Sequence, residues 1–145
     1  MQIDGFSEYA ADEAVWEARV FVSDAVVEYF ETEGQEGRRN EMAVVRVQHT
    51  LRTLRRHGLA RVGETEQFKR EGKFPSGRRR GGDQVVYEAK KDQVRVYGGP
   101  ITVGRETVYL FVTGVTKKEN RADQKLLQRV AKILGAISDD LERRK

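Results

Sequence analysis

The chain has 145 residues, enough for one domain with a single core, and its 38% hydrophobic and 34% charged residues are typical of a polar globular protein. It contains no cysteine, which excludes disulfides and thiol catalysis, and no apolar run reaches the length that crosses a membrane. The acidic start lacks the basic and then apolar pattern of a signal peptide, so we expect a cytoplasmic protein.

Charge is unevenly distributed along the chain. Residues 1–33 carry nine acidic side chains and one arginine, whereas residues 34–145 carry 26 basic and 14 acidic ones. A basic body favours a polyanionic partner, nucleic acid above all, and the alternative is a solvated surface of mixed sign. The acidic part could fold back over the basic surface or face a different partner.

The first elements in chain order are an acidic arm and a strand. Residues 1–15 show no clear periodicity and are expected to form an arm or a short helix, whereas residues 16–22 alternate as a strand does. Ser23 is a candidate N-cap for a helix that Gly34 ends.

The next element is an amphipathic helix over residues 41–57, with Asn40 as its expected N-cap and Gly58 at the expected C-cap. Apolar residues recur along it at steps of three and four, and arginines lie between them. We therefore expect a helix with one buried face and an arginine-rich outer face.

Residues 68–84 form the most basic and least regular segment, with four glycines and Pro75. This composition predicts a mobile loop. Its cations suit the backbone phosphates of RNA, and the alternative is a solvated loop. The candidate RNA-binding residues are Lys69, Lys73, Arg78, Arg79 and Arg80.

Three strands are predicted next, over residues 85–90, 93–98 and 106–115, with a tight turn at Lys91 and Asp92 between the first two. A closing helix begins after Asn120 as its cap. The order strand, helix, helix, three strands, helix indicates an α+β fold, a small antiparallel sheet with the helices on one face. We expect one domain over residues 16–137 and a charged tail over residues 138–145.

Three short motifs in the second half of the chain match those of a known family. Glu88-Ala89-Lys90 matches an acidic-aliphatic-basic triplet, Val94-Arg95-Val96 matches part of the following strand, and residues 113–118 (TGVTKK) match a strand that ends in two lysines before the last helix. Together with the element order, roughly residues 16 to 135 resemble the RelE/HigB superfamily of toxins, in particular its phage-related HigB-like branch.

The resemblance implies a toxin of a type II toxin–antitoxin system that cleaves mRNA on the ribosome. Its partners would be the ribosome, mRNA and a cognate antitoxin, a small helix-turn-helix protein, and it would need no metal or cofactor. Such toxins drive the 2′-OH of a nucleotide onto its own 3′ phosphate. Thr113 and Val115 replace the histidine and aromatic residue often found in the family, a departure that concerns catalysis rather than fold.

Cleavage through a 2′-OH needs a base, positive charge on the phosphorane and an acid for the leaving oxygen. Arg95 could hold the phosphate, and the alternative is that it pairs with Glu88 across the hairpin. Lys117 and Lys118 are both candidates, because crowding by other cations lowers the pKa of a lysine. In a strand their side chains point to opposite faces, which leaves open which of the two acts in the site.

Tyr97 is the fourth catalytic candidate, because it lies two residues after Arg95 on the same face and could stack on a base. Core packing is the alternative for strand tyrosines. His49 and His57, eight residues apart on one helix, make no metal site. Two further functions stay open: a noncatalytic module of this fold that binds nucleic acid or protein, and a ParE-like toxin directed at gyrase.

Overall fold

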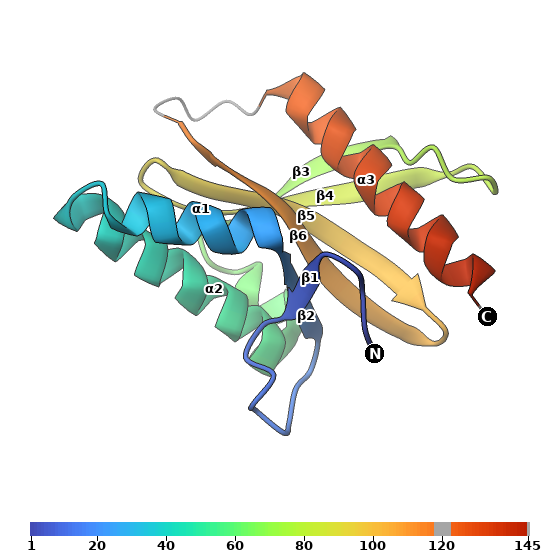
Figure 1. Ribbon diagram of the computed structural model, residues 1–145, viewed down its shortest axis with the longest axis horizontal. Helices are drawn as coiled ribbons and strands as arrows, with labels where there is room; N and C mark the ends of the chain where they lie inside the picture. Colours follow the sequence, from blue (N-terminus) through green and yellow to red (C-terminus); the bar gives the residue numbers. More distant parts are fainter. Residues whose placement is uncertain (118–122, 145) are drawn as a thin grey trace.

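A computed structural model describes residues 1–117 and 123–144 (Figure 1). Within them, six strands and three helices follow in the order β1 (Phe6–Glu8), β2 (Arg19–Ser23), α1 (Asp24–Gly34), α2 (Arg38–Val62), β3 (Phe68–Pro75), β4 (Asp83–Lys91), β5 (Val94–Val103), β6 (Glu106–Thr116) and α3 (Gln124–Arg143). The fold is α+β, as predicted. None of the described helices combines the length and apolarity that crossing a bilayer requires.

The six strands form one mixed sheet in the order β1-β2-β6-β5-β4-β3. Strands β3 to β6 are antiparallel neighbours, and β1 pairs antiparallel with β2. The expected antiparallel sheet is wrong at one pair, because β2 lies parallel to β6. Parallel strands need a long crossover, and here two helices and three strands lie between them in the sequence.

Helices cover both faces of the sheet, and the prediction of helices on one face is wrong (Figure 1). Helices α1 and α2 pack on one face around Val26, Val47 and Phe111, whereas α3 packs on the other around Leu110 and Leu134. Strand β6 is buried continuously from residue 108 to residue 112. Such an unbroken apolar run is typical of a strand covered on both sides.

The helices begin close to where the sequence predicts. Ser23 caps α1 by accepting a hydrogen bond from the Val26 amide at 3.1 Å, as expected. Helix α2 starts at Arg38 rather than after Asn40, whose side chain instead donates to Glu33 at 2.8 Å. Gly58 has a φ of 85° and interrupts α2, which then continues to Val62. The first helical segment therefore ends at Gly58, as predicted, and a second, short segment follows it within α2.

Two segments predicted to lack strands contribute to the sheet. Residues 68–75 form the edge strand β3, with an irregularity between Arg70 and Gly72, so the predicted loop is reduced to residues 76–82. Within the expected N-terminal arm, residues 6–8 form β1. Pairing with a neighbouring strand supplies order that composition alone does not reveal.

The final helix begins at Gln124, with the Asp123 carboxylate accepting a hydrogen bond from the Lys125 amide at 2.9 Å. Asn120, the expected cap, lies outside the described residues. Helix α3 continues to Arg143, through most of the segment expected to be a charged tail.

Candidate functional site

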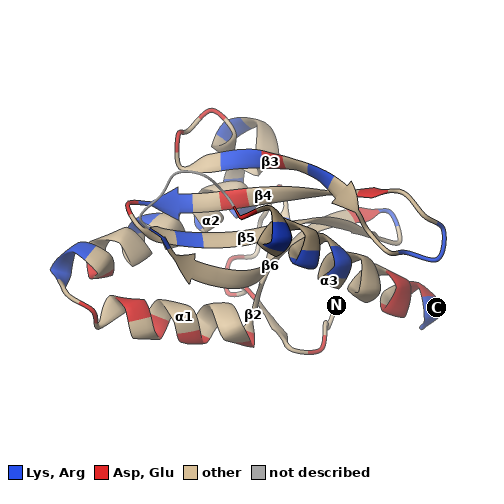
Figure 2. Cartoon of the chain, turned by 90° about the horizontal axis from the view of Figure 1, so that it is seen from above, with Lys and Arg blue, Asp and Glu red and all other residues tan. Residues whose placement is uncertain are grey.

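Charged side chains gather on the α3 face of the sheet, at the end where β6 finishes. Figure 2 shows basic segments of β3, β4 and β5 close together at this end, with an acidic segment of β4 among them. The strand register explains this, because Lys69 is opposite Glu88 and Glu88 is opposite Tyr97, while Lys90 is opposite Arg95. We call these residues, with two neighbours, the polar cluster: Lys69, Glu71, Glu88, Lys90, Arg95, Tyr97 and Lys117.

Glu88 is the centre of the polar cluster and is almost fully buried. Its Oε2 accepts hydrogen bonds from the Tyr97 hydroxyl at 2.6 Å and from Arg95 Nη1 at 3.2 Å, and its Oε1 lies 3.9 Å from Lys90 Nζ. A buried carboxylate requires such partners, since its desolvation is otherwise unfavourable by several kcal/mol. The predicted alternative, an Arg95–Glu88 pair, is therefore present.

Glu71 is the second carboxyl of the polar cluster and lies at the β3 irregularity. Burial raises its pKa, and the negative charge of Glu88 raises it further, while Lys69, Lys90 and Lys117 act in the opposite direction. Lys69 Nζ lies 3.9 Å from Glu71 Oε1, a buried atom that accepts no hydrogen bond from the described part of the chain. Glu71 therefore keeps its proton to a higher pH than an ordinary glutamate, which suits a group that exchanges protons.

Tyr97 is fully buried, so its ring has no exposed face on which a base could stack. Burial first, and then the hydrogen bond to Glu88, raise the pKa of its phenol. The hydroxyl stays protonated at neutral pH and donates to Glu88. The structure places Tyr97 in the core, the alternative considered for strand tyrosines.

Of the two candidate lysines, Lys117 follows β6 directly and is half-buried. Its amide donates to the Gln93 carbonyl at 2.9 Å, which holds it beside the β4–β5 turn. Its charge acts on Glu71, so it belongs to the polar cluster. Lys118 lies outside the described residues.

The predicted RNA-binding residues do not lie together. Lys69 belongs to the polar cluster, and Lys73 is exposed on β3, where it is opposite Val85. Arg78, Arg79 and Arg80 lie on the β3–β4 turn, at the opposite end of the sheet.

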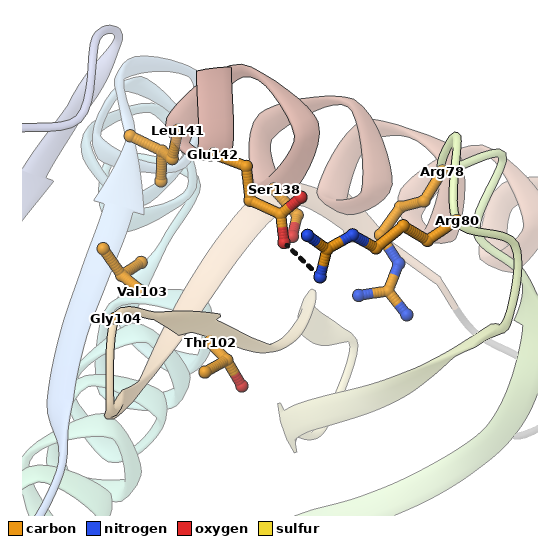
Figure 3. Close-up of a pocket in the computed structure, with 8 residues that line it drawn as sticks. All are labelled: Arg78, Arg80, Thr102, Val103, Gly104, Ser138, Leu141 and Glu142. Carbon is orange, nitrogen blue, oxygen red and sulfur yellow. Dashed lines mark ion pairs between the residues drawn. The ribbon is translucent and has the colours of Figure 1, made fainter. Parts of the chain in front are cut away.

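At that opposite end, Arg78 and Arg80 face a hollow of about 430 Å³ beside the last turns of α3 (Figure 3). Arg80 Nη1 lies 3.7 Å from Glu142 Oε1, and the Arg79 amide donates to Asp139 at 3.1 Å. Acidic side chains of α3 therefore already pair with part of the predicted RNA-binding loop.

Sequence reasoning missed Glu71 and Lys90 as members of the site. The signal for Lys90 was present, because Glu88 and Lys90 are two residues apart and must share a strand face. The predicted turn at Lys91 and Asp92 would place Lys90 opposite Gln93, whereas the observed register places it opposite Arg95. For Glu71 the irregularity in β3 hides the pattern.

Across residues 1–117 and 123–144, no group of three or more histidine, aspartate or glutamate side chains is arranged to hold a metal ion. A scan against models of protein families, a search of curated proteins and a search of solved structures each gave no match.

Proposed function

We propose that this chain is a RelE/HigB-like toxin of a type II toxin–antitoxin system, and that it cleaves mRNA on the ribosome at the polar cluster. The observation that carries the proposal is the convergence of four cations around two carboxyls at one end of the sheet. The cations are Lys69, Lys90, Arg95 and Lys117, and the carboxyls belong to Glu71 and Glu88.

In this proposal the accessible cations meet the phosphate. The Lys69 side chain is 55% exposed and Lys117 is half-buried, so both can approach a ribose–phosphate link. Positive charge fixed at this place stabilises the phosphorane formed when the 2′-OH attacks. Glu71, with its raised pKa, would accept the proton of the attacking 2′-OH and return it to the leaving 5′ oxygen as the bond between phosphorus and that oxygen breaks. Lys118, next to Lys117, is part of the same proposal.

Arg95 and Tyr97 have a different role in this proposal from the one that their sequence pattern predicts. Both are buried and both bond Glu88. They would act as positioning residues that hold the Glu88 carboxylate, while Glu88 in turn fixes Lys90 at 3.9 Å.

The proposal also includes a cytoplasmic location and two targets, the ribosome and mRNA. The inhibitory partner in this proposal is a small helix-turn-helix antitoxin. These parts of the proposal rest on the sequence resemblance and on the accessible cations of the polar cluster, Lys69 and Lys117. The need for no metal or cofactor belongs to the same proposal.

A second candidate function is a noncatalytic protein that binds nucleic acid through the same surface. The burial of Arg95, whose side chain is only 2% exposed, favours it, because a buried guanidinium does not reach a phosphate. The two functions differ in whether message is cut.

The test is induced expression in bacteria, with growth measured and message ends mapped by primer extension on ribosome-bound mRNA. The informative variant is Lys69→Gln/Lys117→Gln, expected to reduce cleavage about a hundredfold. The matched control is Lys73→Gln/Lys91→Gln, which removes the same charge from the other face of β3 and β4. Growth arrest that survives the first double variant, or arrest without new message ends, contradicts the nuclease proposal.

A further inference from the structure

The outer face of α2 carries a second basic surface, separate from the polar cluster. Helix α2 packs on the opposite face of the sheet from α3 (Figure 1). A hollow of about 350 Å³ runs along it and onto the following residues. We call it the arginine groove, and its basic lining residues are Arg46, His49, Arg52, Arg56, His57 and Arg61.

The helix repeat brings these side chains together. Residues 46, 49, 53 and 56 recur at steps of three and four, and residues 52 and 57 lie next to them, so these lining residues share one side of the helix over about 15 Å. The interruption at Gly58 then turns the chain and places Arg61 and Gln67 at the end of the same hollow. All six basic residues are exposed, and among the described residues no acidic side chain lines the groove.

An acidic residue from the N-terminal segment reaches one border of the groove. The Glu13 carboxylate accepts hydrogen bonds from Arg56, the shortest at 2.5 Å, and lies 4.0 Å from Arg52. Arg55, which precedes Arg56 in α2, is buried and donates hydrogen bonds to the Glu8 carboxylate at 2.7 Å and to the Glu13 carbonyl at 3.0 Å. These bonds hold the N-terminal segment against α2. A carboxylate thus already occupies two of the guanidinium groups.

The chemistry of the lining indicates the kind of ligand. Phosphates are contacted by arginine, threonine and glutamine side chains, and the groove presents all three, with Thr53 and Gln67 beside the arginines. Helix α2 contains seven arginines and no lysine, which favours the fork-shaped donor suited to phosphate. Apolar anchors typical of a protein interface are missing from the described lining, where Val62 is the one apolar residue and is buried.

We propose that the arginine groove binds the phosphodiester backbone of nucleic acid, and that Glu13 competes with it for Arg52 and Arg56. The groove lies in the layer opposite the polar cluster, so the two sites can be occupied at once. Binding here is independent of sequence and weakens with salt, because it depends on phosphate contacts. Exposed His49 and His57 add ring faces on which an unpaired base can stack.

The first test is fluorescence anisotropy with a single-stranded deoxyoligonucleotide, which has no 2′-OH and is not cleaved by the proposed mechanism. Failure of the groove is therefore distinguishable from failure of the nuclease. The variant Arg46→Gln/Arg61→Gln removes two exposed arginines that form no ion pair within residues 1–117 and 123–144. We expect its Kd to rise roughly tenfold and its salt slope to fall by about 1.4, at about 0.7 per phosphate contact.

The matched control is Arg38→Gln/Arg105→Gln, which makes the same charge change at two exposed positions outside the groove. Equal Kd values and salt slopes for the two double variants would overturn the proposal. Stronger competition by polyglutamate than by an equal charge of unlabelled oligonucleotide would also overturn it, since that result assigns the groove to an acidic protein.

The second test concerns Glu13. Glu13→Gln should lower the Kd about threefold relative to Asp12→Asn, which is what an exposed ion pair of this kind contributes. Asp12 is exposed and forms no ion pair in the described part of the chain, so the two variants differ only in the contact with Arg52 and Arg56. Equal affinities would show that Glu13 does not compete.

Discussion

The Arg95 guanidinium and the Glu88 carboxylate form a buried ion pair, with 3.2 Å between Nη1 and Oε2. The two residues lie diagonally across the β4–β5 hairpin, because Glu88 is opposite Tyr97 and Arg95 is opposite Lys90. Such a pair contributes little over an apolar pair of the same size, but removing one partner leaves a buried charge without compensation.

Arg95→Ala is therefore expected to lower the free energy of unfolding by about 3–5 kcal/mol. Urea unfolding followed by circular dichroism measures this. Lys73→Ala, at an exposed position on β3, serves as control and should change stability by less than about 0.5 kcal/mol. A variant at position 95 as stable as the parent would contradict the placement of this pair in the core.

Tyr97→Phe keeps the aromatic ring and removes the hydroxyl that donates a hydrogen bond to Glu88 at 2.6 Å. A hydrogen bond to a charged group contributes about 1.5–3 kcal/mol, and the free energy of unfolding should fall by that amount.

The raised pKa of Tyr97 adds a dependence on pH. The native state holds the proton more tightly than the unfolded state, so the associated stability is complete below about pH 10 and is lost as pH rises further. Tyr97→Phe should lose less stability than the parent over this alkaline range. The ultraviolet absorbance of ionised tyrosine supplies an independent reading, because the difference between the alkaline titrations of the parent and of Tyr97→Phe reports the Tyr97 phenol alone.

Glu71→Gln should stabilise the protein at neutral pH. Folding raises the pKa of Glu71 above its ordinary value of 4.5, so the native state binds this proton more tightly than the unfolded state. Stability consequently falls as pH rises from 4.5 through the raised value, and glutamine removes that loss.

The difference in Tm between Glu71→Gln and the parent should accordingly be larger at pH 7 than at about pH 4. Glu64→Gln, at an exposed position in the loop after α2, is the control. Under the proposed function, Glu71→Gln also reduces cleavage although it folds more stably. A variant that is both less stable at neutral pH and fully active would contradict both assignments.

Gly135→Ala tests how closely α3 approaches the β3–β4 turn. A Cβ at this position would lie 1.9 Å from the Ser76 carbonyl oxygen. Because that oxygen belongs to the backbone, the backbone itself would have to move to accommodate the methyl group. We expect the free energy of unfolding to fall by about 1–3 kcal/mol. Gly34→Ala in α1 has nothing within 4 Å and should be neutral or stabilising by up to about 1 kcal/mol.

The local signals of the sequence predicted much of the secondary structure. Ser23 caps α1 and Gly34 ends it, as their residue types indicate. The fold class follows from element order. The sheet edges were missed, because β1 and β3 depend on pairing with β2 and β4 rather than on their own composition. The parallel pairing of β2 with β6 could not be predicted either, because the local sequence pattern of a strand does not indicate which distant strand it pairs with.

The site was predicted in part, for a physical reason that Glu88 illustrates. Alternation along β4 and β5 correctly puts Arg95 and Tyr97 on one face. The hairpin turn lies one residue further along than predicted, so each residue of β4 is opposite a different residue of β5 from the one expected. Glu88 is therefore opposite Tyr97 rather than Arg95. The burial of individual site residues could not be predicted either, because the sequence of a strand does not show whether a helix covers it.

The parallel pairing of β2 with β6 also determines when this chain can fold during synthesis. Ser23 Oγ donates to the Val112 carbonyl, 89 residues further along, so β2 has no inner neighbour until most of the chain has emerged. Closing so long a loop is slow, and both helix layers must wait for the central strand on which they pack. The nascent chain consequently keeps apolar surface exposed until β6 has emerged, a stage at which a chaperone would bind it.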